Sequence, residues 1–470
     1  MISTVQQLRR RIRNRAEEAL RPTVPERPPG PRGVDLVKLH LDFSRDQIGC
    51  LRSIAEKYGR VANFWLGGFN TYLITEPDLI EDVLLRKSSL FQKDKLTFEL
   101  ADVLGQGLLT SQDPVWKRQR KLISPALRRK QIAHYADKMV TRTEEMLDGW
   151  RDGEVRPLHR EVMEATLRIV VDTLFDLEFE EDIDEVASSL DAVVEYFHEQ
   201  GHTLWRFMPE PLPTPMRGKV AEAASRLDEV IYGLIDKRRE DDTEGDDLLH
   251  HLLKAVDDEG NPMTNRQLRD EVLTMFLAGH ETTALAIVYA WVQIGENPEV
   301  EQRFREEIEE VLGDRRAVVE DLEKLPYTRA VIEETLRLYP PAWILGREAR
   351  EDVELGEYTI PAGSTVLLPQ CLVHRDERYF QEPDEFRPER WLNGLADELP
   401  RFAYFPFGGG RRVCIGNYFA MMEAMLVVAT MAQRVELRSA MTEELQVHPS
   451  ITLRPKGSVD MRIRLRPPRS

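Results

Sequence analysis

Residues Phe407–Gly416 read FGGGRRVCIG and place Cys414, one of only three cysteines in the chain, among glycines and arginines. The glycines free the backbone for close approach to another group, and Arg412 supplies positive charge two residues before the thiol. The residues that follow, GNYFAMMEAMLVVATMAQRV, have the apolar spacing of a helix. Cys414 is therefore expected just before a helix N-terminus, where peptide N–H groups and the helix dipole favour a thiolate. The stretch predicts a metal ligand or a nucleophile.

The kind of metal site follows from what accompanies this cysteine. A lone buried cysteine is usually an inert small hydrophobic residue, but the glycines and arginines around Cys414 argue against that interpretation. No second cysteine lies near it to begin a zinc site, so zinc is disfavoured. A single protein thiolate suits a haem iron, because the porphyrin supplies the four in-plane ligands.

Composition is that of a globular protein rather than a fibrous, low-complexity or disordered one. Hydrophobic residues make up 42% of the 470 and charged residues 31%, which supports a packed core. The cysteines are odd in number and far apart, so a reducing cytosol fits better than a secreted disulfide framework. A formal net charge of −18 argues against nucleic acid as a partner, because phosphate backbones need a basic surface.

The N-terminal residues carry no recognisable secretion signal. They lack the apolar core of a signal peptide, and we expect no run in the chain to reach the roughly 18 to 20 apolar residues of a membrane span. A soluble, cytoplasmic protein without an integral membrane anchor is therefore expected. Residues 5–19 place apolar side chains at helical spacing beside five arginines. This pattern fits a membrane-surface helix or, as we favour, a solvated or core-docked one.

Beyond the proline-rich lead-in at residues 25–33, the apolar periodicity is mostly helical. Amphipathic helices are predicted at 45–57, 77–86, 114–123, 131–150, 158–176, 183–199, 217–239, 245–256, 264–294, 298–312 and 327–338. Strand-like runs are few and short, at 61–67, 71–75, 364–370, 450–455 and 461–466. The sequence predicts a mainly α protein with small β-sheets. Residues 1–33 would form an N-terminal helix and lead-in, and residues 34–470 a single domain.

One predicted helix is much longer than the others. Thr264 and Gln267 form a capping-box signature, and the helical pattern then continues to about Ile294. Roughly thirty residues at about 1.5 Å each give about 45 Å, enough to cross the whole molecule. Its apolar middle, LAGHETTALAIVYAW, contains a glycine and two threonines, which are poor helix formers.

With these features the chain resembles the cytochrome P450 family of haem-thiolate monooxygenases over nearly its whole length. The loop at Phe407–Gly416 matches the family's Cys-ligand pattern FxxGxRxCxG at every defining position, and this pattern is highly specific. Four further motifs occur in the family's order: WxxxR at Trp116 and Arg120, the oxygen-activation motif at Ala278–Thr283, ExxR at Glu334 and Arg337, and PERW at Pro388–Trp391.

The resemblance implies haem b as the cofactor, with the Cys414 thiolate as the axial ligand of its iron. Propionate binding is implied for Arg120, Arg347 and Arg412 with the indole N–H of Trp116, and Arg350 competes with Arg347 for that role. Contact with the haem is implied for Phe407, Gly408, Gly416 and Ala278. Glu334, Arg337 and Arg390 are implied to form a structural network beneath the loop.

Proton delivery is implied for the long helix. A helix threonine usually donates back to the carbonyl four residues earlier, here from Thr282 to Ala278. With Gly279 in the intervening turn, we expect the helix to bulge instead and open a groove for dioxygen and water. Glu281 and Thr282 are then implied to pass protons to reduced oxygen. His280 is expected to be a neighbour only.

The implied reaction inserts one oxygen atom of O2 into a lipophilic organic substrate by hydroxylation or epoxidation. No flavin or iron–sulfur region follows the loop, so electrons from NAD(P)H are expected to arrive through a separate ferredoxin or flavodoxin with its reductase. A peroxygenase or isomerase with the same loop and a non-catalytic haem sensor are the alternatives. We expect a monomer.

Two surfaces of the implied fold have expected ligands. By family position, an apolar substrate pocket would include Phe276, Leu277, Trp343, Ile344 and Ile451. The segment Trp116–Lys130 reads WKRQRKLISPALRRK and has seven basic residues and no acid. We expect this segment to steer an acidic redox partner, with a solvated helix face as the simpler alternative.

Overall fold

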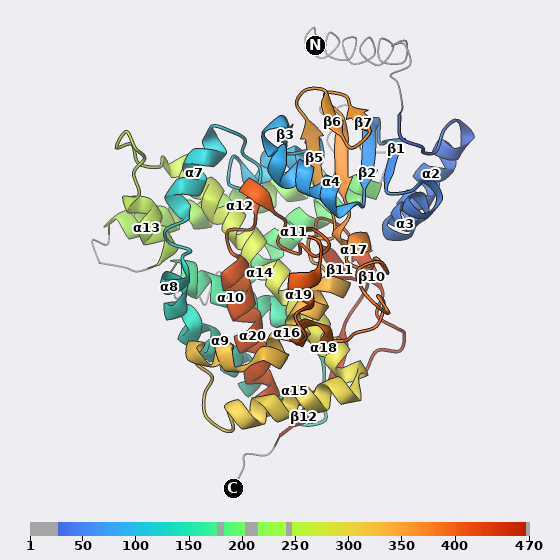
Figure 1. Ribbon diagram of the computed structural model, residues 1–470. Coiled ribbons are helices and arrows are strands. Elements are labelled where there is room, and N and C mark those ends of the chain that lie inside the picture. The colour runs from blue at the N-terminus through green and yellow to red at the C-terminus, as the bar shows by residue number, and fades with distance from the viewer. Residues whose placement is uncertain (1–26, 176–182, 203–214, 241–246, 467–470) are drawn as a thin grey trace.

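A computed structural model of the protein describes residues 27–175, 183–202, 215–240 and 247–466. Its longest element is α14 (Asn265–Glu296), and the predicted capping box closes its first turn. The Thr264 hydroxyl accepts from the Gln267 N–H at 3.2 Å, and the Gln267 side chain accepts from the Thr264 N–H at 3.0 Å. Because residues on all sides of α14 are buried, this helix runs through the interior of the protein (Figure 1).

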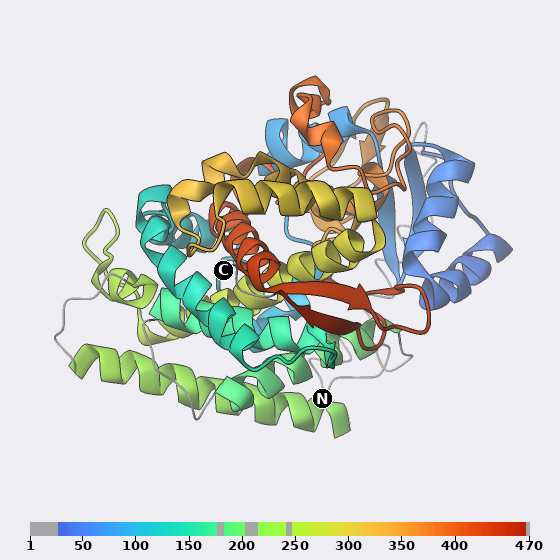
Figure 2. The same cartoon turned by 90° about the horizontal axis from the view of Figure 1, so that it is seen from below.

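Other helices pack around α14. Four of its neighbours are α10 (Leu158–Phe175), α12 (Pro215–Glu240), α16 (Pro326–Leu338) and α20 (Asn417–Arg434). The remaining longer helices are α2 (Val34–Arg45), α3 (Gln47–Tyr58), α7 (Val115–Ile123), α9 (Ala136–Asp148), α11 (Ile183–His202), α13 (Leu248–Lys254) and α15 (Pro298–Val311). Figures 1 and 2 show most of these helices massed together, with α2, α3 and the largest sheet at one side. Short helical segments are α4 (Pro77–Glu81), η1 (Asp82–Arg86), α5 (Lys95–Glu99), α6 (Ala101–Leu104), α8 (Arg129–Ile132), α17 (Gln370–Val373), α18 (Glu389–Leu392), α19 (Leu395–Glu398) and η6 (Gly410–Arg412).

The largest sheet has the strand order β1-β2-β8-β5-β3. Its strands are β1 (Val61–Leu66), β2 (Phe69–Ile74), β8 (Thr365–Leu368), β5 (Leu345–Ala349) and β3 (Phe91–Gln92), and only the β2–β8 pair is parallel. Gly67 and Gly68 close the β1–β2 hairpin with φ angles of 58° and 83°, which two-residue turns require. This order pairs strands from residues 61–92 with strands from residues 345–368, and β3 leads into the region that precedes α7.

Three smaller sheets complete the described β-structure. They are β4 (Val155–Pro157) with β12 (Asp460–Leu465) and β9 (Val435–Ser439), β10 (Val447–Pro449) with β11 (Leu453–Pro455), and β6 (Val353–Leu355) with β7 (Tyr358–Ile360). The predicted mainly α fold with small sheets is confirmed. Strand β11 matters for the site, because it ends beside α14.

Some predicted elements differ from the structure for identifiable reasons. The predicted helix at 131–150 is divided into α8, a short turn and α9. Helix α2 escaped prediction because its apolar spacing is interrupted, and Val34 and Val37 are 85% and 65% exposed. Strand β5 escaped because its sequence, LGREA, lacks the alternation of a strand. The helix predicted within residues 5–19 lies outside the described residues.

Helix α14 is long and apolar enough to cross a membrane by length and composition, contrary to the prediction that no run would be. It is the one such helix found among the described residues. However, 83% of its most apolar window is buried inside the protein. Protein side chains already cover this surface, so α14 is a core helix.

Candidate functional site

The loop Phe407–Gly416 leads directly into α20, as the sequence predicts. The Cys414 N–H donates to the Phe407 carbonyl at 2.9 Å, and α20 begins at Asn417. Gly408 and Gly410 have positive φ angles of 70° and 64°. A Cβ atom at Gly410 would lie 1.7 Å from the Leu84 carbonyl oxygen. Only glycine fits there, because the loop presses against the backbone of η1.

The thiol of Cys414 differs from the other two thiols in its accessibility. Its residue is exposed, whereas Cys50 and Cys371 are buried. Burial raises the pKa of Cys50 to about 11 and of Cys371 to about 12, so both are inert thiols. Surrounding protein also raises the pKa of Cys414, but the Gly416 N–H and the Arg120 guanidinium act in the opposite direction. Protein surrounds much of the Cys414 side chain, but the residue keeps an exposed surface through which a ligand can reach the sulfur.

Helix α7 packs against the loop Phe407–Gly416. The Trp116 ring is 5% exposed and lies under the Arg412 guanidinium, 4.4 Å from its centroid. Arg120 donates to the Val413 carbonyl at 2.9 Å, and Arg412 donates to the Ser111 carbonyl at the same distance. The predicted residues of WxxxR and of the Cys-ligand loop are therefore in direct contact.

Four basic side chains converge next to this loop without a described carboxylate partner. Lys93, Arg347, Arg350 and Arg412 line a cavity of about 110 Å³, so the cavity contains both Arg347 and its predicted competitor Arg350. Arg347 is 7% exposed, and its one described hydrogen bond runs to the neighbouring Gly346 carbonyl at 2.7 Å. Burial lowers the pKa of Arg412 to about 10, and the Arg347 charge adds to the effect. Partly buried cations that repel one another create a favourable site for an anion.

The donor set fits the two carboxylates and the iron of a haem. Besides the basic side chains, Ser111 Oγ and Gln112 Nε2 are buried without a described hydrogen-bond partner, and both can donate to an oxygen. The accessible Cys414 thiol is available as an axial ligand on the same loop as Arg412. Arg120, Arg347, Arg412, Ser111 and Gln112 would hold the carboxylates, and Cys414 the iron.

Beneath the loop lies the network implied for ExxR and PERW. The Glu334 carboxylate accepts two hydrogen bonds from Arg337, both at 2.8 Å, and one from Arg390 at 2.9 Å. The Trp391 indole N–H and the Arg387 backbone N–H complete its shell, each at 2.9 Å. Arg337 uses its remaining donors on the carbonyls of His374, Pro383 and Glu385. Every charge in this cluster has a partner.

The middle of α14 departs from the bulge that the sequence predicts. The helix is continuous from Asn265 to Glu296, and the Thr282 hydroxyl donates to the Ala278 carbonyl at 2.8 Å. The back-bond satisfies the hydroxyl within the helix, so no groove forms at Gly279. Ala278 is nevertheless exposed, and Gly279 and Thr282 are partly exposed, although the other residues of α14 from Leu268 to Ile294 are buried. This face is therefore open in the middle of a core helix.

The Glu281 carboxylate is held by β11 and the residue before it. It accepts from the Thr452 hydroxyl at 2.6 Å and pairs with the Arg454 guanidinium. Arg454 also pairs with Asp191 of α11 at 3.3 Å. Burial raises the pKa of Glu281, but the Arg454 charge and these hydrogen bonds outweigh burial and lower it below its ordinary value. Glu281 is thus an anchored carboxylate, and His280 beside it contacts the Phe276 carbonyl.

The five residues predicted for a substrate pocket fall in two packed clusters. Phe276 and Leu277 belong to the large helical core, and the Phe276 ring meets Phe175 edge-on at 4.8 Å. Trp343 and Ile344 belong to the cluster around β1 and α3, and Trp343 donates to the Ser450 carbonyl at 2.9 Å. Ile451 packs against the helical core. The structure does not gather all five residues in one cluster.

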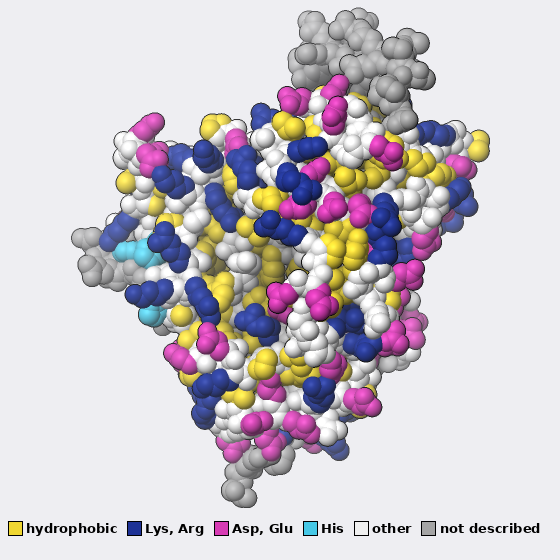
Figure 3. Space-filling model, viewed as in Figure 1, with side chains coloured by type: hydrophobic (Ala, Val, Ile, Leu, Met, Phe, Trp, Pro, Cys, Tyr) yellow, Lys and Arg dark blue, Asp and Glu magenta, His cyan; other side chains and the backbone are white. Residues whose placement is uncertain are grey.

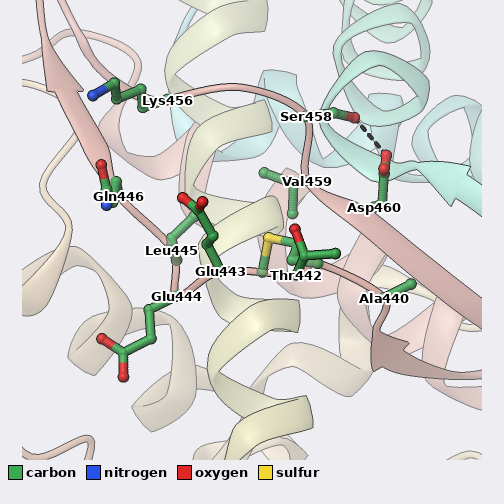
Figure 4. Close-up of a pocket in the computed structure, with 11 residues that line it drawn as sticks. Ala440, Thr442, Glu443, Glu444, Leu445, Gln446, Lys456, Ser458, Val459 and Asp460 are labelled. Carbon is green, nitrogen blue, oxygen red and sulfur yellow. Dashed lines mark hydrogen bonds between the residues drawn. The ribbon is translucent and has the colours of Figure 1, made fainter.

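A separate cavity of about 290 Å³ lies between the loop after β9 and the start of β12 (Figure 4). Its lining includes Glu443, Glu444, Lys456 and Asp460, and Ser458 donates to Asp460. None of the predicted site residues lines it. Its lining is that of a polar hollow at the surface.

Sequence reasoning missed several groups that the structure brings to the site. Lys93, Ser111 and Gln112 lie outside the family motifs, and Thr452 and Arg454 lie about 170 residues after Glu281 (171 and 173). The local sequence carries no signal for them, since Lys93 lies among other polar residues in FQKDK and Ser111, Gln112 and Thr452 are ordinary neutral polar residues. Their roles depend on long-range packing.

Comparisons with known proteins agree with the motifs. The family model described as Cytochrome P450 matches residues 28–459. The chain is 34% identical to cyclooctatin synthase of Streptomyces melanosporofaciens over 426 residues, covering 90% of this chain and 92% of that protein. It is 34% identical to cyclooctat-9-en-7-ol 5-monooxygenase of the same organism, covering 88% and 91%. It is 32% identical to pentalenene oxygenase of Streptomyces avermitilis, covering 80% and 83%.

Proposed function

The chain belongs to the cytochrome P450 family of haem-dependent monooxygenases, and from this we propose that Cys414 is its iron ligand and a cyclic terpenoid its substrate. The accessible Cys414 thiol, on the same loop as an Arg412 guanidinium without a described carboxylate partner, is the observation that carries the ligand assignment. Two relatives named as oxygenases of terpene substrates, cyclooctat-9-en-7-ol 5-monooxygenase and pentalenene oxygenase, support the substrate class. We further infer that residues 34–470 form one catalytic unit, which acts as a monomer in the cytoplasm.

The ligand assignment is tested by spectroscopy of the reduced protein with carbon monoxide. We expect the red-shifted Soret band of a thiolate ligand, and its loss in Cys414→Ser. Cys371→Ser is the matched control, because that thiol is buried and held neutral by its surroundings. A thiolate spectrum that survives in Cys414→Ser would exclude the assignment.

When bound, the haem supplies reductive activation of O2 and transfer of one oxygen atom to the substrate. The protein's own residues orient that chemistry. Arg120, Arg347 and Arg412 would bind the carboxylates, while the Gly416 N–H and the Arg120 charge oppose the rise that burial causes in the pKa of Cys414.

Thr282 holds a proton at the open face of α14. Its hydroxyl oxygen is free to accept a hydrogen bond while its proton points to the Ala278 carbonyl. Glu281 positions this turn through its contacts with Thr452 and Arg454. In Thr282→Ala we expect about tenfold less product per NAD(P)H and more hydrogen peroxide, with Thr282→Ser close to wild type. Equal product yields in Thr282→Ala and wild type would contradict this role.

An acidic ferredoxin or flavodoxin is the proposed electron donor, and it would dock over α7 and α8. Figure 3 shows Lys and Arg side chains gathered there. The basic patch carries less unpaired charge than its sequence suggests. Arg118 pairs with Asp257 at 2.6 Å, and Arg129 pairs with Glu323 at 3.1 Å. Lys117, Arg128 and Lys130 are exposed and are the proposed docking residues.

Stopped-flow reduction at several salt concentrations tests this docking site. Arg128→Glu with Lys130→Glu should slow the first electron transfer severalfold at low ionic strength and less at high ionic strength. Lys237→Glu with Arg239→Glu on α12 is the matched control of equal charge change. Equal slowing by both double variants would reduce the effect to net charge and exclude a docking patch.

The substrate class is tested by binding spectra with a panel of cyclic terpenes, fatty acids, steroids and macrolides. A cyclic terpenoid should produce the largest shift of the Soret band at micromolar concentration. Tighter binding and oxidation of a fatty acid would overturn the terpenoid proposal while leaving the iron ligand intact.

A further inference from the structure

An acidic hairpin lies beside α7, the helix proposed to receive the electron donor. It comprises residues 256–262 between α13 and α14, and a β-bridge joins its two ends. The Asp257 carboxylate organises the turn, because it accepts from the backbone N–H groups of Glu259 at 3.0 Å and Asn261 at 2.9 Å. Figure 3 shows acidic side chains beside Lys and Arg in this part of the surface, at the upper left.

Two basic side chains of α7 hold the hairpin. Arg118 donates to the Asp257 carboxylate at 2.6 Å and to two backbone carbonyls of the hairpin, both at 3.1 Å. This contact with Arg118 is the main reason that the pKa of Asp257 is lowered to about 2, so the carboxylate stays ionised. Lys121 pairs with both oxygens of the Asp258 carboxylate. Acids of the same chain thus offset two positive charges of the helix.

A comparison of Lys117 with Lys121 shows what the hairpin does to α7. The two residues are four apart, so their side chains lie on the same face of the helix. Lys117 is exposed and forms no described ion pair, whereas the Lys121 ammonium group contacts Asp258. The Lys121 and Asp258 side chains are 64% and 82% exposed. Water screens such a pair, so another carboxylate can replace Asp258 at little cost.

We propose that the hairpin is an internal competitor of the acidic electron donor, in which Asp258 holds Lys121 until a carboxylate of the donor replaces it. The inference rests on the proposed docking of an acidic donor over α7 and α8. During encounter the Asp258 charge offsets Lys121 and repels an approaching carboxylate, and charges at the rim of an interface mainly set the association rate. The first contact of the donor is thereby confined to Lys117, Arg128 and Lys130.

A restrained affinity suits the stoichiometry of the reaction. Insertion of one oxygen atom from O2 consumes two electrons and two protons and releases one water molecule. A [2Fe–2S] ferredoxin delivers one electron at a time, so each turnover needs two docking events, and the oxidised donor must leave between them. A docking surface on which an internal acid occupies one lysine favours this exchange.

Stopped-flow reduction of the holoenzyme by an acidic plant-type [2Fe–2S] ferredoxin tests the competition. Asp258→Asn removes the competing charge and leaves the turn around Asp257 in place. Below saturating ferredoxin, its first electron transfer should be up to about fivefold faster than in wild type at low ionic strength, which corresponds to one charge pair about 4 Å apart in water. The gain should disappear at high ionic strength. Addition of Lys121→Gln to Asp258→Asn should return the rate to that of wild type.

Glu310→Gln on α15 is the matched control, because it makes the same charge change at an exposed position outside α7, α8 and the hairpin. An equal gain in Glu310→Gln would reduce the effect to net charge and overturn the inference. A gain that persists when Lys121→Gln is added would also overturn it, because the released lysine would then not be its source.

The double variant Arg128→Glu with Lys130→Glu separates this inference from the proposed docking site. If the double variant is reduced slowly while Asp258→Asn matches wild type, the donor docks as proposed and only the competition is wrong. If neither variant differs from wild type at low ionic strength, the donor docks elsewhere and both proposals are wrong.

Discussion

Two clusters of buried charge lie near the Cys414 loop, and they are built in opposite ways. Around Glu334 every donor meets an acceptor, and the Glu334 and Arg337 side chains are both 0% exposed. Around Arg412, five basic side chains line one cavity, and the acids beside them are engaged by Arg411 and Thr97. The first cluster is complete within the chain, whereas the second is completed by an anion from outside.

The difference separates structural charge from ligand-binding charge. A fully paired buried cluster is costly to break, because removal of one member leaves the others charged and unpartnered. An unbalanced cluster already carries that cost before its ligand arrives, and the ligand recovers it as affinity. Changes in the two clusters should therefore affect different measurements.

The largest expected effect comes from the paired cluster. Glu334→Gln should lower the free energy of unfolding by about 3 to 5 kcal/mol, because it leaves the Arg337 and Arg390 guanidinium groups without an anionic partner. Denaturant unfolding and haem content of the purified protein measure this loss. Glu310→Gln on the exposed side of α15 is the control. A change below about 1 kcal/mol would remove the distinction between the two clusters.

Glu271 sharpens the comparison because it is a buried acid in neither cluster. It is 0% exposed, one carboxyl oxygen accepts from the Leu108 N–H at 3.0 Å, and the other has no described partner. Burial raises its pKa to about 8. The folded state thus holds a proton that the unfolded state has released, so stability falls as the pH rises from about 4.5 to about 8.

Glu271→Gln should remove this loss. At pH 5 the variant and wild type should unfold at similar denaturant concentrations, and at pH 8 the variant should be more stable by up to about 4 kcal/mol. Unfolding at pH 5, 6.5 and 8 provides the measurement. Parallel curves for the two proteins would mean that Glu271 is ionised in the folded state.

The smallest expected change in stability comes from the unbalanced cluster. Arg412→Leu should weaken haem binding by about 10- to 100-fold, the worth of one charge-assisted hydrogen bond, while helix content measured by circular dichroism stays unchanged. Arg411→Leu is the matched control, because its guanidinium is 38% exposed and already paired with Asp113. Loss of helix content in Arg412→Leu would place Arg412 with the structural charges.

The sequence predicted the parts of the site that depend on neighbours in the chain. The capping box, the glycine loop and the helix after Cys414 follow from spacing of a few residues, and the structure contains all three. The bulge predicted at Gly279 is absent, because the back-bond of Thr282 satisfies its hydroxyl within the helix. Lys93 and Arg454 were not predicted. Their partners lie on other strands or helices, and no local pattern records such pairings.

The reach of Arg412 across the chain has a consequence for biosynthesis. It donates to the Ser111 carbonyl, 301 residues earlier, and Arg120 reaches the Val413 carbonyl over 293 residues. A nascent chain therefore has nearly all of its helices before either contact can form. Haem capture is then a late event, after translation has passed residue 416, and a ribosome stalled upstream releases a polypeptide that cannot be rescued by adding cofactor. Expression of this protein should respond to haem supply at the stage of maturation, with the synthesis of the chain itself unaffected.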